Sequence, residues 1–209
     1  MTSVVELRLT DPAGGVQCLQ TASSLPPLTG ALVEDKVWFT FKARIQAHIR
    51  LSWLDFHSQM LMVWYAILGA GLAVVTIRYP QVLGKDTDLV SAVLAIALLG
   101  LSMAVANRDF RGRAIAMRQN YLDLQKLYEE LKLRGSCSAA DLDRYHVLLC
   151  CVENHKEIDD KLFRARYART LSSRKPTLVE TAEAYANLVG RVVVTFLLYA
   201  APFLIWWAV

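Results

Sequence analysis

The chain has 209 residues, 55% of them hydrophobic, and a formal net charge of +4. Its mean hydropathy of +0.31 exceeds that of ordinary soluble domains. The composition therefore argues against a soluble globular protein and indicates a membrane protein. Four segments are predicted in chain order: an N-terminal arm (1–32), a juxtamembrane helix with a transmembrane hairpin (33–106), a cytoplasmic helical hairpin (107–175) and a C-terminal membrane helix (176–209).

The N-terminal arm has turn-forming residues around short apolar runs, which predicts either a small hairpin or a mobile arm. It lacks a basic start followed by an apolar run, so no cleaved signal peptide is expected. From 32 to 57, aromatic and basic residues recur at helical spacing, which predicts a helix that lies on or enters the inner membrane surface and continues into the first span. The aromatic residues predicted to face lipid or partner helices are Trp38, Phe41, Trp53 and Phe56.

Three blocks of 18 residues contain no charged side chain: 60–77, 89–106 and 192–209. At about 1.5 Å per residue, each block spans roughly 27 Å as a helix, close to the hydrocarbon core of a bilayer. A helical hairpin buried in a soluble core is the alternative, but the remaining chain is too short and too polar to cover three such helices. The predicted fold class is an all-α membrane protein with two transmembrane helices, a third at the C-terminus that either spans or lies in the interface, and a long cytoplasmic antiparallel helical hairpin.

Basic residues predict the orientation in the membrane. They gather before the first block and after the second, whereas the loop between them (78–88) balances two bases against two acids. By the positive-inside rule, the N-terminus lies in the cytoplasm and this loop lies outside. The bases predicted to form a collar facing anionic headgroups are Lys42, Arg44, Arg50, Arg108, Arg111 and those from Arg164 to Arg169.

The second block continues without a proline into a heptad pattern, which predicts a coiled-coil seam. The seam residues are Phe110, Ala114, Met117, Tyr121, Leu124, Tyr128 and Leu131. One continuous helix from 89 to 134 would be about 69 Å long, so it would project far into the cytoplasm.

The sequence RGSCS (134–138) ends this helix, and Ser138 with Asp141 predicts a capping box for the next one. Residues 108–134 carry seven bases and four acids (net +3), whereas 141–161 carry three bases and six acids (net −3). These opposite charges predict two antiparallel helices packed face to face. After a linker, Thr177 and Glu180 predict another capping box before the last helix, which Pro202 can kink.

The stretch LLCCVENHKEIDD (148–160) concentrates the candidate chemical groups of a cytoplasmic motif: Glu153, Asn154, His155 and Asp159. His155 and Asp159 share a helix face, as half of a metal site would. The structural interpretation makes His155 a seam residue hydrogen-bonded to Arg118 or Tyr121. The cysteines form no CxxC pair, and no phosphate loop, HExxH or GxSxG motif is present. Neither an enzyme nor a cofactor or metal is therefore expected.

Small and hydroxyl residues on the first two blocks allow helices to approach closely, within one hairpin or between copies. The candidates for helix packing or a pore are Gly69, Ala73, Ser91, Gly100, Ser102, Ala104 and Asn107. Three spans of one copy cannot enclose a water-filled channel. A pore would therefore require a homo-oligomer, with Ser91, Ser102 and Asn107 lining it.

The order of these segments resembles the SLATT domains, the SMODS and SLOG associating two-transmembrane effector domains of prokaryotic conflict systems. The resemblance rests on the FKARIQAHIRLSWLDFHSQMLMVWYAIL segment (41–68), on RAIAMRQNYLDLQKLYEEL (113–131) and on VENHKEIDD (152–160), and it covers roughly 36–200. The last two segments look most like the subgroup encoded beside reverse transcriptases.

This resemblance implies a multi-pass effector of an anti-phage defence system in the bacterial inner membrane. Such an effector is expected to oligomerise, form pores and cause abortive infection when a partner, a reverse transcriptase or another sensor, releases it. The family has no catalytic residues to transfer. We expect lipid contact but no direct nucleic acid and no small-molecule substrate. The alternatives are a membrane-anchored scaffold that recruits a reverse transcriptase or nucleotidyltransferase, and an enzyme that uses Glu153, His155 and Asp159 with a metal.

Overall fold

The computed structural model describes residues 30–208 except 83, 86 and 172, so nearly all of the predicted N-terminal arm lies outside the described residues. The elements are α1 (Gly30–Arg78), α2 (Thr87–Arg108), α3 (Phe110–Arg134), α4 (Ala139–Cys150), α5 (Glu157–Arg166) and α6 (Leu178–Ala208). The described residues contain no strand, which confirms the all-α class.

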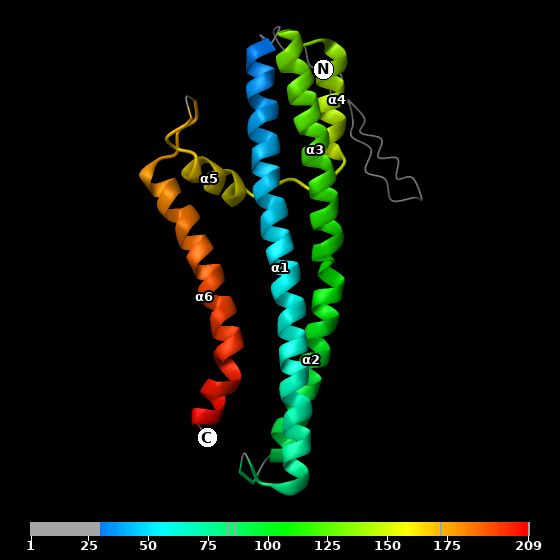
Figure 1. Ribbon diagram of the computed structural model, residues 1–209, viewed down its shortest axis with the longest axis vertical. Helices are drawn as coiled ribbons and strands as arrows, with labels where there is room; N and C mark the ends of the chain where they lie inside the picture. The colour runs from blue at the N-terminus through cyan, green and yellow to red at the C-terminus, as the bar shows by residue number, and fades with distance from the viewer. Residues whose placement is uncertain (1–29, 83, 86, 172, 209) are drawn as a thin grey trace, which may run out of the picture.

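A long antiparallel hairpin dominates the molecule, with α1 on one side and α2 followed by α3 on the other (Figure 1). With 49 residues, α1 is about 74 Å long and contains the first apolar block near its C-terminal end. The prediction that the juxtamembrane helix continues into the first span is therefore confirmed. In its N-terminal half, Phe41 is buried against other helices of the chain, which is one of the two predicted environments for this residue.

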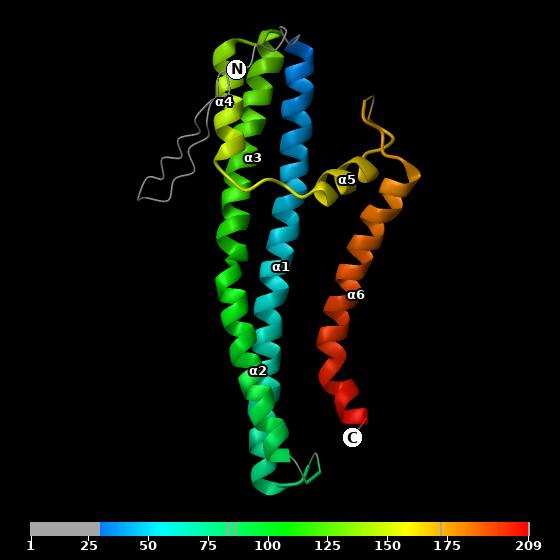
Figure 2. The same cartoon turned by 180° about the vertical axis from the view of Figure 1, so that it is seen from behind.

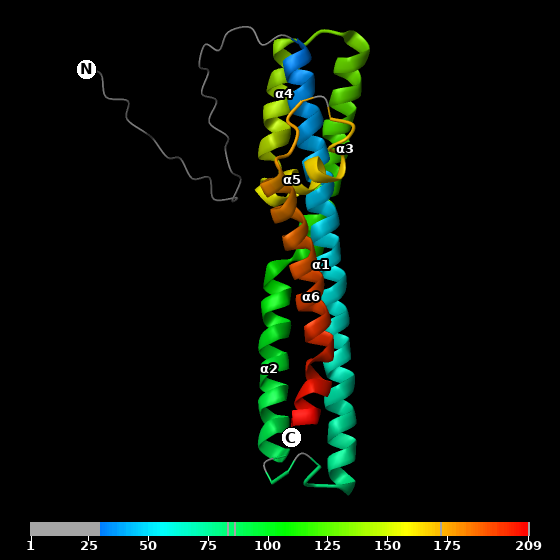
Figure 3. The ribbon, with the colours of Figure 1, turned by 90° about the vertical axis from the view of Figure 1, so that its left-hand side faces the viewer.

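The molecule divides into two parts along this hairpin. We call α3, α4, α5 and residues 30–57 of α1 the head bundle. We call α2, α6 and residues 60–77 of α1 the membrane half. In Figure 3 the three helices of the membrane half run alongside one another below the head bundle.

The predicted continuous helix from 89 to 134 is wrong at one residue. Asp109 has a left-handed conformation, with φ 38° and ψ 52°, and separates α2 from α3. Its carboxylate accepts the Gly112 N–H at 3.0 Å and so caps the first turn of α3. A Cβ on residue 112 would collide with that carboxylate, which explains why glycine suits this position. The break lies at the border between the membrane half and the head bundle.

The heptad seam of α3 packs mainly against α1, and α4 covers its flank. Its central cluster joins the following buried residues of the two long helices: Val33, Val37, Phe41, Leu124, Leu127 and Leu131. A second cluster continues the contact toward the membrane with Ala47, Leu51, Ala114 and Met117. The small alanines of α1 let the two helices approach closely, so α1 fills the seam that the sequence assigned to the returning helix.

The predicted returning helix is shorter than expected. It consists of α4, with only 12 residues, which packs antiparallel to α3 through the ion pairs Arg113–Glu153 and Arg144–Glu130. The predicted Ser138–Asp141 capping box is present, and the carboxylate also accepts both terminal nitrogens of Arg134 at 3.0 Å. Because the Ser138 backbone N–H and then the Arg134 guanidinium favour its ionised form, the pKa of Asp141 falls to about 2.

After α4 the chain leaves the α3 seam and crosses α1 to reach α5, as Figure 2 shows from behind. There Phe163 of α5 packs on Phe39 and Trp38 of α1, with ring centroids 6.0 and 5.3 Å apart. Ion pairs from Arg164 to Glu180 and from Lys161 to Glu183 join α5 to α6. The second predicted capping box is also present, since Thr177 N donates to Glu180 at 2.8 Å and Glu180 N donates to the Thr177 hydroxyl at 3.2 Å.

Candidate functional site

The membrane half exposes its apolar side chains. Three helical segments are long and apolar enough to cross a membrane: Ala31–Arg78, Thr87–Arg134 and Leu178–Leu204. The second of them comprises α2 and α3 with Asp109 between them. Within their most apolar 18-residue windows, only 6%, 0% and 0% of residues are buried inside the chain. Because water would penalise such surface heavily, these helices require lipid or further apolar helices as neighbours. The third apolar block belongs to α6, which continues through Pro202.

The predicted helix-packing residues separate into two faces. Gly69 and Gly100 are exposed, and a Cβ added at either would meet no atom within 4 Å. Ala73, Ala104 and Asn107 are exposed as well. Ser91 and Ser102 are half-buried, and their hydroxyls donate to the carbonyls of Thr87 and Leu99 in their own helix. The small-residue faces are therefore unused by packing within this chain.

An open cleft lies between α1 and the junction of α2 with α3, where the first apolar block begins and the second ends. Its polar lining residues are Asp55, Gln59, Ser102, Asp109 and Arg111. The Gln59 amide donates to the Asp55 carboxylate at 2.7 Å. Of the residues predicted to line a pore, Ser102 therefore lines this open cleft within one copy of the chain.

A buried polar cluster holds the head bundle together at the level where α4 ends. The guanidinium of Arg44, a residue only 1% exposed, donates to the side-chain oxygen of Asn120 and to the carbonyls of Leu148 and Leu149 at 3.0 and 3.2 Å. Asn120 also donates to Leu148 O at 2.7 Å. These carbonyls belong to the last turn of α4, where backbone acceptors lack helical partners and a cation is favourable. One arginine of α1 thereby fixes both α3 and α4.

The predicted basic collar is wrong for one of its members. Arg44 is buried in this cluster, and Arg50 and Arg164 form ion pairs within the chain. The sequence held a usable signal for Arg44, because it lies in the buried row of α1 formed by Val37, Phe41, Ala47 and Leu51. Asn120 lies likewise between Met117 and Leu124 in the buried row of α3. A polar residue inside an apolar row indicates a buried hydrogen-bonded contact.

The residues of the 148–160 motif do not form a common site. Glu153 binds Arg113 through both carboxylate oxygens at 2.7 to 3.0 Å. Asp159, which is 2% exposed, accepts two hydrogen bonds from Arg50 at 2.8 and 3.0 Å. Asn154 is exposed. Within the described part of the chain, no group of three His, Cys, Asp or Glu residues could hold a metal ion.

His155 is half-buried. Burial lowers its pKa, and the positive charge of Arg44 lowers it further, so the imidazole is neutral at pH 7. Its Nδ1 is buried and has no hydrogen-bond partner among the described residues. No hydrogen bond joins it to Arg118 or Tyr121 in that part of the chain, and the Tyr121 ring lies 5.8 Å from the ring of His48. The predicted hydrogen bond from His155 to the α3 seam is therefore not present among the described residues.

These features define a helical membrane protein in which a two-helix apolar hairpin extends from a packed head bundle. The model of a family described as SMODS and SLOG-associating 2TM effector domain family 5 matches residues 31–208, and the chain belongs to this family. No curated protein and no solved structure matches the chain. Membership of this family implies a membrane effector of defence systems that works with partner proteins. The family is not a known enzyme family.

Proposed function

We propose that copies of this chain assemble in the bacterial inner membrane, with the N-terminus in the cytoplasm, into a homo-oligomer that opens a pore. Opening would dissipate the ion gradients of an infected cell and cause abortive infection. The observation that carries this proposal is the unused small-residue face of the membrane half. Gly69 and Gly100 have open space around them and lie among exposed apolar side chains.

Helix association in lipid depends on close packing, because lipid tails are as apolar as the side chains themselves. Small residues allow that approach, and here the chain supplies them without covering them. The hairpin of one copy can therefore pack its Gly100 and Ala104 face on a neighbouring copy. Ser102 and the polar cleft at Asp55 and Gln59 would then lie toward the entrance of a water-filled path.

The head bundle provides the connection to a trigger. Since α1 runs unbroken from the head bundle into the membrane half, a displacement of its N-terminal half moves the first span directly. On the other arm of the helical hairpin, the left-handed residue Asp109 allows α2 to change its angle relative to α3. A reverse transcriptase or another sensor bound to the head bundle would use these two elements to control the pore.

The test is leakage from cells and from vesicles that contain the full-length protein. Gly100→Leu and Ala104→Leu enlarge the proposed contact face and should abolish ion or dye leakage. Ala95→Leu is the matched control, because it makes the same enlargement at an exposed position elsewhere on α2. Equal leakage by the unchanged protein and by all three variants would overturn the proposed contact face. An intact membrane potential during an effective defence response would overturn the pore itself.

That last outcome would favour a membrane-anchored scaffold that recruits a reverse transcriptase or nucleotidyltransferase. One observation supports this second candidate: α3 exposes Ile115, Leu122 and Leu133, with Leu133 90% exposed. Exposed apolar side chains of this kind suit a protein partner. A scaffold should lose partner co-purification in Leu122→Glu while its membrane insertion stays unchanged.

Catalysis has no part in the proposal. His155→Ala should retain full leakage and defence activity if the protein remains folded. Loss of defence in that variant, with assembly and leakage intact, would support the metal-dependent enzyme instead.

A further inference from the structure

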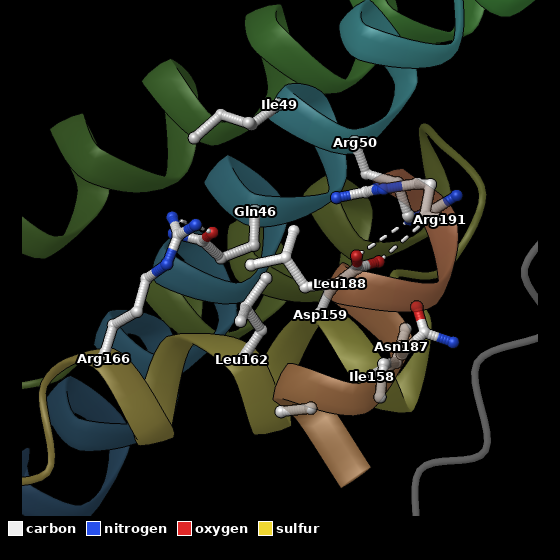
Figure 4. Close-up of a pocket in the computed structure, with 11 residues that line it drawn as sticks. Gln46, Ile49, Arg50, Ile158, Asp159, Leu162, Arg166, Asn187, Leu188 and Arg191 are labelled. Carbon is white, nitrogen blue, oxygen red and sulfur yellow. Dashed lines mark hydrogen bonds and ion pairs between the residues drawn. The ribbon is translucent and has the colours of Figure 1, made fainter. Parts of the chain in front are cut away.

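A partly enclosed pocket with excess positive charge lies where α1, α5 and α6 meet (Figure 4). Arg50 comes from α1, Asp159 and Arg166 from the α5 helix, and Arg191 from α6. Asp159 is the one acidic residue among the residues that line this pocket, and Arg50 already binds it through two hydrogen bonds. Three guanidinium groups against one carboxylate leave a net charge of +2.

The acidic side chains nearby contact other bases and not the three arginines of the pocket. Asp160 and Glu180 bind Arg164 at 2.8 and 3.0 Å. Glu183 binds Lys161 at 2.7 Å. Arg166 donates only to a neutral partner, the side-chain oxygen of Gln46, at 3.2 Å. Among the described residues, Asp159 is therefore the one carboxylate that forms an ion pair with an arginine of this pocket.

Arg191 is the clearest sign of an absent counter-charge. Its Nε is buried and has no hydrogen-bond partner among the described residues. Its guanidinium carbon lies 4.8 Å from the centre of the Trp53 ring, which orients the group without neutralising it. A buried donor without a partner is costly, and a charged one more so. A bound anion would satisfy this donor and offset the repulsion among the arginines.

The position of the pocket indicates where that anion comes from. Arg191 immediately precedes the apolar block 192–209, and Arg50 lies ten residues, or about 15 Å, before the block 60–77. Arg191 therefore lies near the headgroup layer of a bilayer that the block 192–209 crosses, and Arg50 lines the same pocket. Tryptophan and arginine at such a level are typical of the interface, and basic pockets between membrane helices bind anionic lipid headgroups.

We propose that the Arg50–Arg166–Arg191 pocket binds the phosphate of an anionic phospholipid of the inner leaflet. The cavity volume is only about 20 Å³, which is room for one water-sized atom. A phosphate oxygen would therefore enter the cavity while the rest of the headgroup lies at its mouth. The bound lipid would bridge α6 to α1 and α5. This inference concerns the resting protein in the membrane and does not depend on pore formation.

Binding can be measured on the full chain in a neutral detergent, by native mass spectrometry and by the melting temperature during titration. The probes are phosphatidylglycerol, phosphatidylcholine and inorganic phosphate. Phosphatidylglycerol should bind and raise the melting temperature, whereas the other two should not. Arg191→Gln should weaken its binding roughly tenfold, the effect of losing one charge-assisted hydrogen bond. Arg108→Gln, an exposed arginine at the end of α2, should bind as the unchanged protein does.

Arg166→Gln provides a second variant in case Arg191→Gln does not fold, because Arg166 is exposed and tolerates replacement. It too should weaken phosphatidylglycerol binding. Equal binding by the unchanged protein and both variants would overturn the proposal. Saturation by inorganic phosphate at the same affinity would also overturn it, since the site would then recognise a soluble anion and not a lipid.

Discussion

The head bundle and the membrane half place their apolar side chains in opposite ways. In the head bundle, Leu124 and Leu127 are 0% exposed, whereas in the membrane half Ile77 is 84% exposed and Phe196 is 70% exposed. The same helix α1 contributes to both parts. The head bundle is therefore stabilised by contacts within one chain, whereas the membrane half depends on lipid or on other copies for its neighbours. Substitutions should separate the two parts by their effect on unfolding.

The largest effect is expected in the head bundle from Arg44→Met. The change leaves Asn120 and two carbonyls of α4 buried without their charged donor, so the free energy of unfolding should fall by about 3–5 kcal/mol. Circular dichroism during denaturant unfolding in detergent measures it. Arg118→Met, at an exposed position of α3, should change the value by less than about 0.5 kcal/mol. Equal small losses in both variants would show that the buried cluster does not hold α4.

Leu124→Ala should reduce the free energy of unfolding by about 2–5 kcal/mol, because it opens a cavity in the central cluster between α1 and α3. The matched control is Leu133→Ala on the same helix, where the side chain is 90% exposed and the loss should stay below about 0.5 kcal/mol. The same unfolding experiment compares them. A similar loss at both positions would mean that another chain covers Leu133.

Asp109 lies at the border between the two parts and should have an intermediate effect. Asp109→Ala removes the cap of α3 and places alanine in a left-handed conformation, which together cost about 1–2 kcal/mol. Asp109→Gly also removes the cap but tolerates the positive φ, so it should cost less. Thermal unfolding of the two variants provides the comparison. If alanine costs no more than glycine, the two helices join without the left-handed residue.

The smallest effect on unfolding is expected in the membrane half from Gly100→Leu. A side chain there meets open space, so the free energy of unfolding of the detergent-solubilised monomer should change by less than about 0.5 kcal/mol. The variant should nevertheless fail to form oligomers in bilayers, which chemical crosslinking measures. A loss of several kcal/mol in the monomer would show that Gly100 packs within its own chain.

Much of the fold could be predicted because its signals are local. The three uncharged blocks, the continuation of α1 and both capping boxes each depend on a few consecutive residues or on a simple repeat. The break at Asp109 was missed because no proline or glycine marks it. Asp109 followed by Gly112 was a weak signal, since aspartate favours the position before a helix and can adopt a positive φ.

Local signals could not predict which distant segments of the chain pack against each predicted helix face or pair with each charged residue. The seam of α3 is a local pattern, but its choice of α1 over the returning helix depends on how well small residues of α1 fit it. Arg44 looked like a membrane-facing base because the positive-inside rule counts charges without regard to burial. Glu153, His155 and Asp159 are close in sequence, yet the chain leaves the helix after Cys150 and gives each a different neighbour.

The sequence by itself determined that this protein is helical, that it belongs in a membrane and where the capped helices α4 and α6 begin. Hydropathy, capping and periodicity act over a few turns, so they are independent of the rest of the molecule. Only the tertiary structure decided which helix fills the α3 seam, that Arg44 is buried, and that three arginines line one pocket with Arg191 over the Trp53 ring. Those outcomes depend on shape and charge brought together from distant parts of the chain, which no local pattern encodes.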